Sequence, residues 1–145
     1  MKSMVVGLAS LLLVGLIGCM SETRNPIEGA WQIVQGTQTR ADTSFSYSQA
    51  DLFGMKMIVD NQWAIFGRYV GDGDTVTYYS GGSYTLEGKI YTESIVYSKT
   101  SLSVGRVVPF EVEVRNDTLI QRGPVKTGEY AGDDWDLYEV WVRVK

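Results

Sequence analysis

Hydrophobic and polar residues alternate along much of the chain, most clearly at its C-terminal end. From Tyr138 to Val144 every second residue is tyrosine or valine, and residues of different chemistry stand between them. This period of two, in β-branched and aromatic residues, is typical of a β-strand. A strand at the end of a chain frays unless it pairs with another segment. We therefore expect residues 136–145 to pair with the first strand, at about 30–35.

The middle of the chain predicts a series of β-hairpins. Short apolar runs alternate with turn signals such as Glu87-Gly88 and Asn116-Asp117. The expected strands are residues 55–59, 63–70, 75–79 or 83–86, 89–97, 107–115 and 118–122. Residues 36–50 have no clear period. They predict a long loop, with or without a short helix at 48–53, where it could cover the mouth of a barrel.

These elements predict an all-β fold. About eight strands at regular spacing, without an internal repeat or a clear amphipathic helix, are typical of a sandwich or a barrel. Sequential hairpins, many glycines at turns and terminal strands that lack other partners favour a single antiparallel up-and-down β-barrel of about eight strands. Closure would remove the sheet edges. A β-sandwich is the alternative.

The N-terminus predicts export. A basic start at Met1-Lys2 and an apolar run at 5–17 are typical of a secretory signal peptide, and the run is too short to span a membrane. The tetrapeptide Leu16-Ile17-Gly18-Cys19 resembles the bacterial lipobox. The resemblance implies removal of residues 1–18, acyl chains on Cys19, a tether at 19–28 and a barrel domain at 29–145. The alternative is an ordinary signal peptide followed by a coincidental cysteine.

Cys19 is the only cysteine, so no intramolecular disulfide can form. A lipidated Cys19 explains this lone residue, and two or more acyl chains suffice for stable anchoring. Met20, not aspartate, follows it, which in lipoproteins of this kind favours the outer membrane over the inner membrane. We therefore expect an exported protein whose partner is the membrane, held through the lipid on Cys19.

Composition excludes several functions. The chain has 13 basic and 17 acidic residues and no histidine. The acidic balance gives no support to nucleic-acid binding. Without histidine there is no histidine-dependent triad, general base or metal ligand. The acidic pairs Asp72-x-Asp74 and Asp133-Asp134 lie in glycine-rich segments and are interpreted as turn residues. No catalytic motif is apparent, so we expect neither an enzyme nor a metal or other cofactor.

Three stretches carry a family likeness. Gly29-Ala30-Trp31 on the first expected strand resembles the Gly-x-Trp signature of lipocalins and fatty-acid-binding proteins. Residues 82–93 and 138–145 look like those of a bacterial, calycin-type family of small lipocalin-like exported lipoproteins. The resemblance implies that Trp31 plugs the closed end of the barrel. It also implies that a basic residue of the last strand packs over this ring, with Arg143 as the first candidate and Lys145 as the second.

The closing strand allows two orientations. Simple patterning places its valines inside the barrel and leaves Glu139 and Arg143 in solvent. The last strand of fatty-acid-binding proteins instead points an Arg-x-Tyr pair inward, which implies that Glu139, Trp141 and Arg143 face the interior. Buried charges need partners, and Glu93 could pair with Arg143 in that case.

The expected function is binding of a small hydrophobic or amphipathic ligand inside the barrel. The alternative is a filled barrel that acts as a cell-surface protein- or glycan-binding module without a small-molecule ligand. Aromatic walls and a few orienting polar groups would make the ligand site. The candidate ligand-binding residues are Trp31, Trp63, Arg68, Tyr91, Glu93, Glu139, Trp141 and Arg143.

Overall fold

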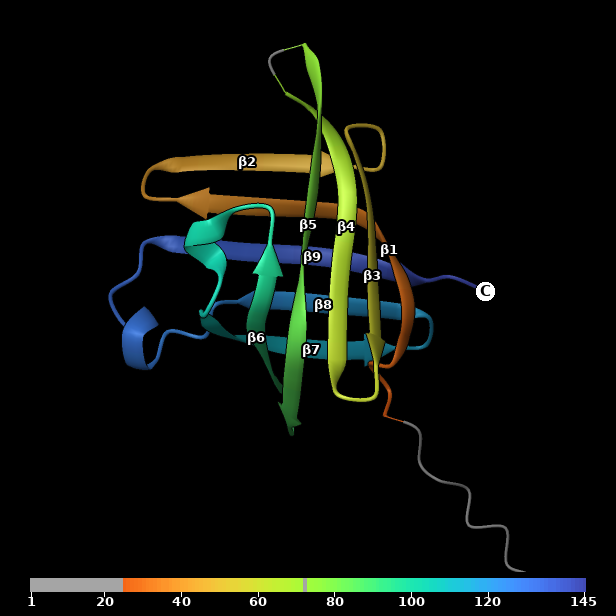
Figure 1. The fold of residues 1–145 in the computed structure, drawn as a ribbon, viewed down its shortest axis with the longest axis vertical. Coiled ribbons are helices and arrows are strands. Elements are labelled where there is room, and N and C mark those ends of the chain that lie inside the picture. The colour runs from red at the N-terminus through yellow and green to blue at the C-terminus, as the bar shows by residue number, and fades with distance from the viewer. Residues whose placement is uncertain (1–24, 72) are drawn as a thin grey trace, which may run out of the picture.

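A computed structural model describes residues 25–71 and 73–145. The predicted signal peptide at 1–18 and Cys19 lie outside the described residues. Nine β-strands and two short 3-10 helices follow one another along the described chain (Figure 1). They are β1 (Gly29–Arg40), β2 (Thr43–Ser48), β3 (Leu52–Val59), β4 (Gln62–Gly71), β5 (Asp74–Glu87), β6 (Ile90–Ser98), η1 (Ser101–Ser103), β7 (Val107–Arg115), β8 (Thr118–Gly123), η2 (Gly128–Tyr130) and β9 (Trp135–Arg143). Within this part of the chain, no helix has the length and apolar character needed to cross a membrane.

Eight of the strands close into an antiparallel barrel. From β3 to β9 each strand pairs with the next one along the chain, and β1 pairs with both β3 and β9. The β1–β9 ladder runs from Trp31 opposite Arg143 to Arg40 opposite Trp135. The prediction that the first and last strands are neighbours is therefore confirmed, and with it the up-and-down barrel. Closure of the sheet excludes the β-sandwich.

Turn chemistry shapes the hairpins much as the sequence predicts. Asp60 and Asn61 link β3 to β4 with φ angles of 47° and 60°. Two positive φ values in a two-residue loop match the twist of a hairpin, and asparagine and aspartate tolerate them. The sequence predicts a strand at either 75–79 or 83–86. In the structure the single long strand β5 covers both ranges. The register of β5 against β6 shifts between Gly81 and Gly82.

The expected loop at 36–50 is wrong. The first strand continues to Arg40, and β2 returns beside it as a ninth strand outside the barrel. The partner of β1 changes along its length: Gln32 is the last residue opposite β3, and Gln35 is the first opposite β2. A register shift against β9 marks the same point. The sheet therefore divides here, and β2 leans over one end of the barrel.

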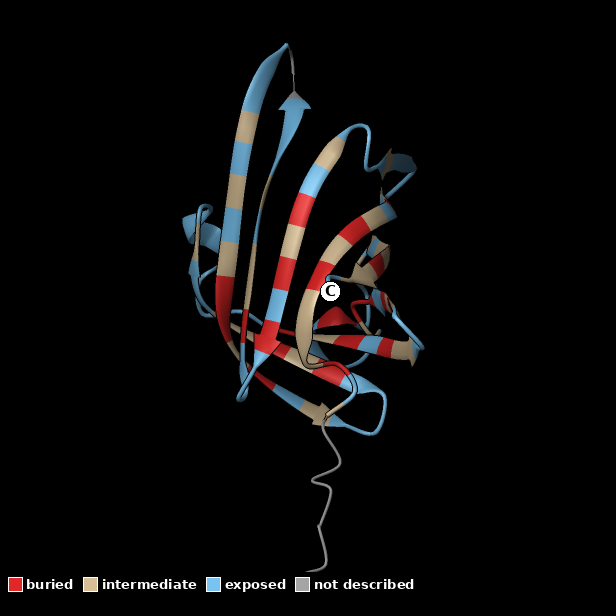
Figure 2. Cartoon of the chain, turned by 90° about the vertical axis from the view of Figure 1, so that its right-hand side faces the viewer, coloured by how far each residue is buried: buried red, intermediate tan, exposed pale blue. Residues whose placement is uncertain are grey.

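The core lies toward the end of the barrel where β1 begins. Buried residues alternate with exposed ones along the strands and are concentrated in this half, whereas the far ends of β4 and β5 are exposed (Figure 2). Ile27, at the end of the predicted tether, is only 2% exposed and belongs to this core. The buried apolar residues are Ile27, Trp31, Ile33, Ile58, Trp63, Tyr84, Tyr91, Val108, Phe110, Val112, Leu119, Tyr130 and Trp141.

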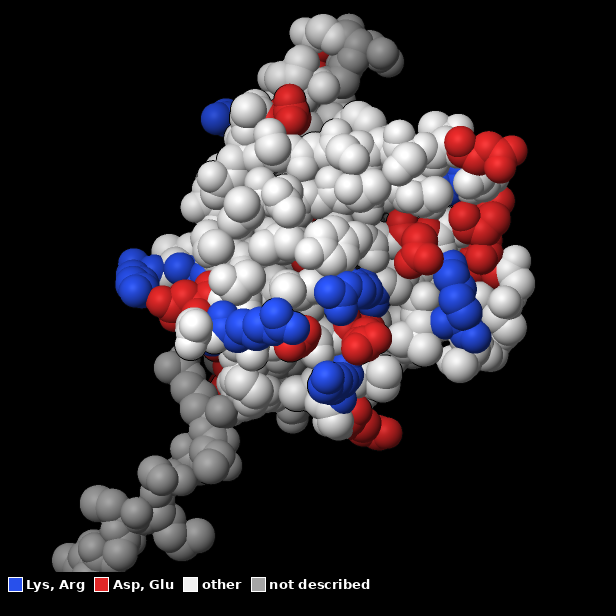
Figure 3. Space-filling view, turned by 180° about the vertical axis from the view of Figure 1, so that it is seen from behind, with Lys and Arg blue, Asp and Glu red and all other residues white. Residues whose placement is uncertain are grey.

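The outer face of the barrel has two parts. Figure 3 shows side chains of both charges mixed over the lower half of the rear face, acidic side chains along its upper right edge, and a broad upper central area without charged side chains. Ion pairs on the barrel surface include Arg115–Glu113 of β7, at 2.6 Å. Outward residues of β1 and β2 pair through hydroxyl groups instead, as in Thr37–Ser46 at 3.0 Å. Neither charge dominates the visible face.

Candidate functional site

The closed end of the barrel is plugged by Trp31, which is fully buried. Its indole Nε1 donates to the carbonyl of Ile27 at 2.8 Å. The guanidinium carbon of Arg143 lies 4.1 Å from the centre of the Trp31 ring, a distance suited to a cation–π interaction. Arg143 also donates to the carbonyls of Glu28, at 2.6 Å, and Pro26, at 2.9 Å. The predicted packing of Arg143 over Trp31 is confirmed.

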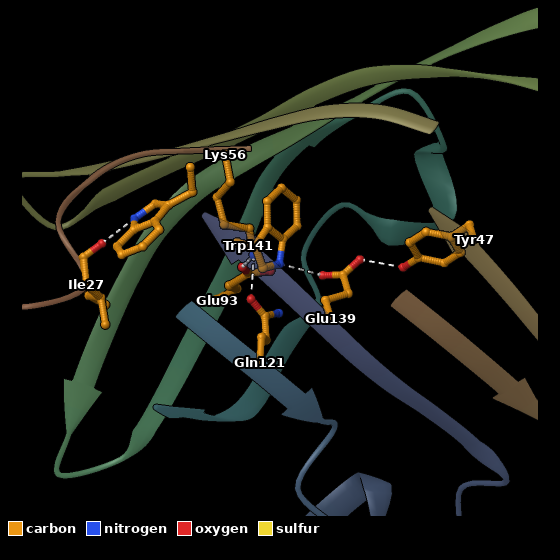
Figure 4. Close-up of polar contacts among 8 residues, drawn as sticks. Ile27, Tyr47, Lys56, Glu93, Gln121, Glu139 and Trp141 are labelled. Atoms are coloured by element: carbon orange, nitrogen blue, oxygen red, sulfur yellow. Dashed lines mark hydrogen bonds and ion pairs between the residues drawn. The ribbon is translucent and has the colours of Figure 1, made fainter. Parts of the chain in front are cut away.

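Lys56 occupies the middle of the interior. It lies on β3 and is 2% exposed. Its ammonium donates to Glu93 on β6 at 3.0 Å and to Gln121 on β8 at 2.6 Å (Figure 4). Three aromatic rings surround it, with centres 5.2 to 5.9 Å from the nitrogen, and these rings belong to Trp63, Tyr91 and Trp141. Hydrogen bonds, an opposite charge and ring faces together satisfy this buried cation.

Two donors close to Lys56 have no hydrogen-bond partner in the described chain, namely Trp63 Nε1 and the Tyr91 hydroxyl. Burial, followed by the nearby Glu93 carboxylate, raises the pKa of Tyr91 well above its usual value. The hydroxyl therefore stays protonated although no acceptor meets hydrogen-bond geometry with it. The side chains around Lys56 are buried.

Glu139 is a second buried carboxyl group, 8% exposed, on β9. Tyr47 of β2 donates its hydroxyl to Oε1 at 2.6 Å, and Trp141 Nε1 donates to Oε2 at 3.2 Å (Figure 4). Burial raises the pKa of Glu139 above its usual 4.5, and the Glu93 carboxylate adds to the rise. The charge of Lys56 and the two hydrogen bonds act in the opposite direction but do not cancel the effect of burial.

A cavity of about 350 Å³ opens above Glu139. We call it the mouth cavity. Strands β1 to β5 and β9 contribute its walls, and most of its lining is aromatic or aliphatic. The lining residues are Gln38, Phe45, Tyr47, Asp51, Leu52, Ile65, Tyr69, Val70, Tyr78 and Glu139.

Glycines make room for the rings of the mouth cavity. Gly54 and Gly67 face each other across β3 and β4, and a Cβ atom on either would lie within 2.5 Å of the Tyr78 hydroxyl. A Cβ atom on Gly36 would lie 2.4 Å from the Tyr47 ring. Side chains at these positions would push the two tyrosines away from Glu139. Burial and then the Glu139 charge raise the pKa of Tyr78 to about 12, so its hydroxyl is protonated at neutral pH.

The closing strand takes the inward orientation implied by the resemblance. Glu139 and Trp141 are buried, while Val140 and Val142 are half-buried on the other face. Simple patterning is therefore wrong for this strand. The expected ion pair between Glu93 and Arg143 is also wrong, because Lys56 neutralises Glu93 and Arg143 lies at the closed end.

The eight candidate ligand-binding residues fall into four places. Glu139 lines the mouth cavity. Trp31 and Arg143 form the plug, while Trp63, Tyr91, Glu93 and Trp141 surround Lys56. Arg68 is exposed and lines two outer grooves of about 420 and 280 Å³.

Sequence reasoning missed Lys56 and the aromatic walls of the mouth cavity. A lysine in a strand is normally solvated, so only its partners Glu93 and Gln121, far along the chain, reveal the inward position. Phe45 and Tyr47 offered a usable signal, because they alternate with serine in a segment interpreted as a loop. Among residues 25–71 and 73–145, no three or more acidic or cysteine side chains gather in a way that could hold a metal ion.

The up-and-down strand order and the closure of β1 on β9 agree with the residue pattern, and the Trp31–Arg143 plug is the feature that the lipocalin resemblance implied. The fold is a lipocalin-like barrel. No protein-family model and no curated protein matches the chain. Among solved structures, it is similar to a lipocalin-like protein from Bacteroides uniformis ATCC 8492, with 15% identity and a TM-score of 0.46. The match covers 83% of this chain and all of the other.

Proposed function

We propose that this chain is a membrane-anchored lipocalin-like protein that binds a small hydrophobic or amphipathic molecule at the open end of its barrel. The mouth cavity is the observation that carries this proposal. Its volume, about 350 Å³, lies within the range of small-molecule sites, and its walls are apolar with a few polar groups. Among the candidate residues, Glu139 would contact the ligand and Trp141 would lie directly below it.

The anchor is the second part of the proposal. The lipobox-like tetrapeptide ending at Cys19 supports acylation of this residue after export, with the outer membrane favoured. Labelled palmitate should enter the wild-type chain and be absent from Cys19→Ala. Equal labelling of the two chains would contradict the anchor and leave the ligand site untouched.

Ligand binding can be tested with the chain from residue 20 onward, which retains the whole described barrel. Trp141 donates to Glu139 at the floor of the mouth cavity, so occupation should change tryptophan fluorescence. A panel of short-chain alcohols, fatty acids and alkylamines should give at least one saturable response. No saturable response across the panel would contradict the proposal.

A pair of variants on β4 tests where the ligand sits. Ile65→Trp should fill the mouth cavity, because Ile65 is one of its lining residues, and should abolish binding measured by calorimetry. Phe66→Trp is the matched control, since Phe66 is 43% exposed and follows Ile65 on the opposite face of the strand. Equal loss in both variants would contradict a site inside the barrel.

The second candidate function is a surface module for protein or glycan. The buried side chains around Lys56 favour it, because hydrogen bonds and an ion pair within the chain occupy the polar groups of Lys56 and Glu93 there. Failure of the whole ligand panel, together with an intact fold, would favour this alternative.

A further inference from the structure

The interior contains two carboxyl groups among aromatic rings, and one of them has its own cation. Glu93 holds the Lys56 ammonium at 3.0 Å. The rings of Trp63, Tyr91 and Trp141 surround this nitrogen. The lower site is therefore an ammonium site that the chain itself fills.

The upper site has the same kinds of groups without a cation of its own. Glu139 lines the mouth cavity together with Tyr47 and Tyr78, and Phe45 lies beside Tyr47 at 5.9 Å and Tyr69 beside Tyr78 at 6.4 Å between ring centres. Among the described residues, the lining of the mouth cavity includes the carboxyl groups of Asp51 and Glu139 and no lysine or arginine. The cavity is therefore acidic.

The nearby cations are engaged elsewhere. Lys56 is held by Glu93 and Gln121, and Arg143 is held by backbone carbonyls at the closed end. Arg68 is exposed on the outer side of β4. Among the described residues no lysine or arginine forms an ion pair with Glu139, so a cation in direct contact with its carboxylate would come from a ligand.

Glu139 can still accept hydrogen bonds. An ionised carboxylate offers about four lone-pair positions, and Tyr47 and Trp141 use one on each oxygen. Asp51 also accepts two hydrogen bonds, from the backbone and hydroxyl of Ser48 at 3.1 and 3.0 Å, but it is exposed to water whereas Glu139 is buried. Glu139 is thus the better partner for a donor that enters the cavity.

We propose that the mouth cavity binds a small alkylamine, with its ammonium beside the Glu139 carboxylate and its chain along the apolar walls. This inference rests on the proposed function and names the class of ligand. Ring faces attract ammonium groups, and the opposite charge of Glu139 adds to this attraction in a poorly solvated site. A fatty acid would instead bring a third carboxylate toward Asp51 and Glu139, and like charges repel.

Four ligands of equal chain length separate the head group from the chain. Octylamine, octyltrimethylammonium, octanol and octanoate are titrated by calorimetry into the chain from residue 20 onward, at neutral pH. The two cations should bind at least tenfold more tightly than octanol, and octanoate should bind most weakly. Equal affinities, or a preference for octanoate, would overturn the inference and leave the proposed function standing. No binding by any of the four, or by the wider panel above, would contradict both.

Glu139→Gln tests the residue. The amide keeps the size of the side chain and removes the charge, so octylamine should bind about tenfold more weakly while octanol is unchanged. Glu111→Gln is the control, because Glu111 is an exposed glutamate on β7. If the folded Glu139→Gln chain still prefers octylamine to octanol as strongly as the wild-type chain does, the ammonium binds elsewhere. This result would overturn the inference. If the variant does not fold, the four-ligand series on the wild-type chain decides.

Discussion

The two ends of the barrel interior use similar groups for different purposes. At the closed end, Glu93 meets Lys56, and every ring around them is packed. At the open end, Glu139 meets only neutral donors and faces a cavity. The carboxylate of the closed half thus has a cation from the chain itself, whereas Glu139 has no ion-pair partner among the described residues. The comparison distinguishes a charge that stabilises a fold from a charge that is available for binding.

The strand positions explain the difference. Lys56 lies on β3 where this strand still pairs with β1, so the barrel wall is continuous around it. Above Gln32, β2 replaces β3 beside β1. The wall divides there, and the space that it leaves becomes the mouth cavity. One change of strand partner therefore separates the filled half from the open half.

The largest expected effect is at Lys56. Lys56→Met would leave Glu93 without its cation and Gln121 without its donor. Removing one partner of a buried ion pair costs about 3–5 kcal/mol, so the free energy of unfolding in urea should fall by about this amount.

The double variant Lys56→Met/Glu93→Gln is the control for this prediction. Neutralising both partners removes the uncompensated charge, so most of the lost stability should return. A single variant as stable as the wild-type chain would contradict the view that the closed end depends on this pair.

An intermediate effect is expected at Arg143. Arg143→Ala removes the cation over Trp31 and two hydrogen bonds to backbone carbonyls. We expect a loss of about 1–3 kcal/mol and faster amide exchange at Ile27, measured by hydrogen exchange. Lys145→Ala is the control, because Lys145 is exposed and its ion pair is with Asp117. Unchanged exchange at Ile27 would show that Arg143 does not hold this segment.

The smallest effect, and one that depends on pH, is expected at Glu139. Because burial raises its pKa above the usual 4.5, the folded chain binds this proton more tightly than the unfolded chain. The resulting stability is complete below the unfolded pKa and is lost as pH rises through the folded pKa. Glu139→Gln cannot titrate, so it should match the wild-type chain at low pH and be more stable at neutral pH.

Urea unfolding at a series of pH values measures this difference, with Glu111→Gln as the control. The groups that face Glu139 are Tyr47, Tyr78, Lys56 and Glu93, and the tyrosines stay protonated throughout the range. A Glu139→Gln curve parallel to the wild-type curve would show that Glu139 ionises normally.

Much of the barrel could be predicted from the sequence because its signals are local. The period of two marks β7 and the closing strand, and Asn116, with a φ of 54°, marks a hairpin turn. The prediction of a loop at 36–50 is wrong because this range is rich in serine and threonine, which obscure the alternation of apolar and polar residues around Phe45 and Tyr47. Residues 43–48 form a strand because they pair with the backbone of β1, an interaction that the local sequence does not reveal.

The site was harder to predict because the role of each residue depends on a partner far away in the sequence. Glu93 and Glu139 look alike in the sequence, and both lie on inward faces. Only the position of Lys56 gives them different roles, and no spacing reveals that a lysine at 56 reaches a glutamate at 93. The contact between Trp31 and Arg143 could be predicted because the family resemblance implies it, whereas residue patterns do not reveal contacts between distant positions.

The short segment from Asn25 to Glu28 also sets a direction for the molecule. It is fastened at the closed end through Ile27 and Arg143. Extended chain spans about 3.5 Å per residue, so the six steps from Cys19 to Asn25 reach roughly 20 Å. With the proposed lipid on Cys19, the plugged base would rest near the bilayer and the opening would look outward, so that cargo would arrive from the aqueous side, not from the lipid.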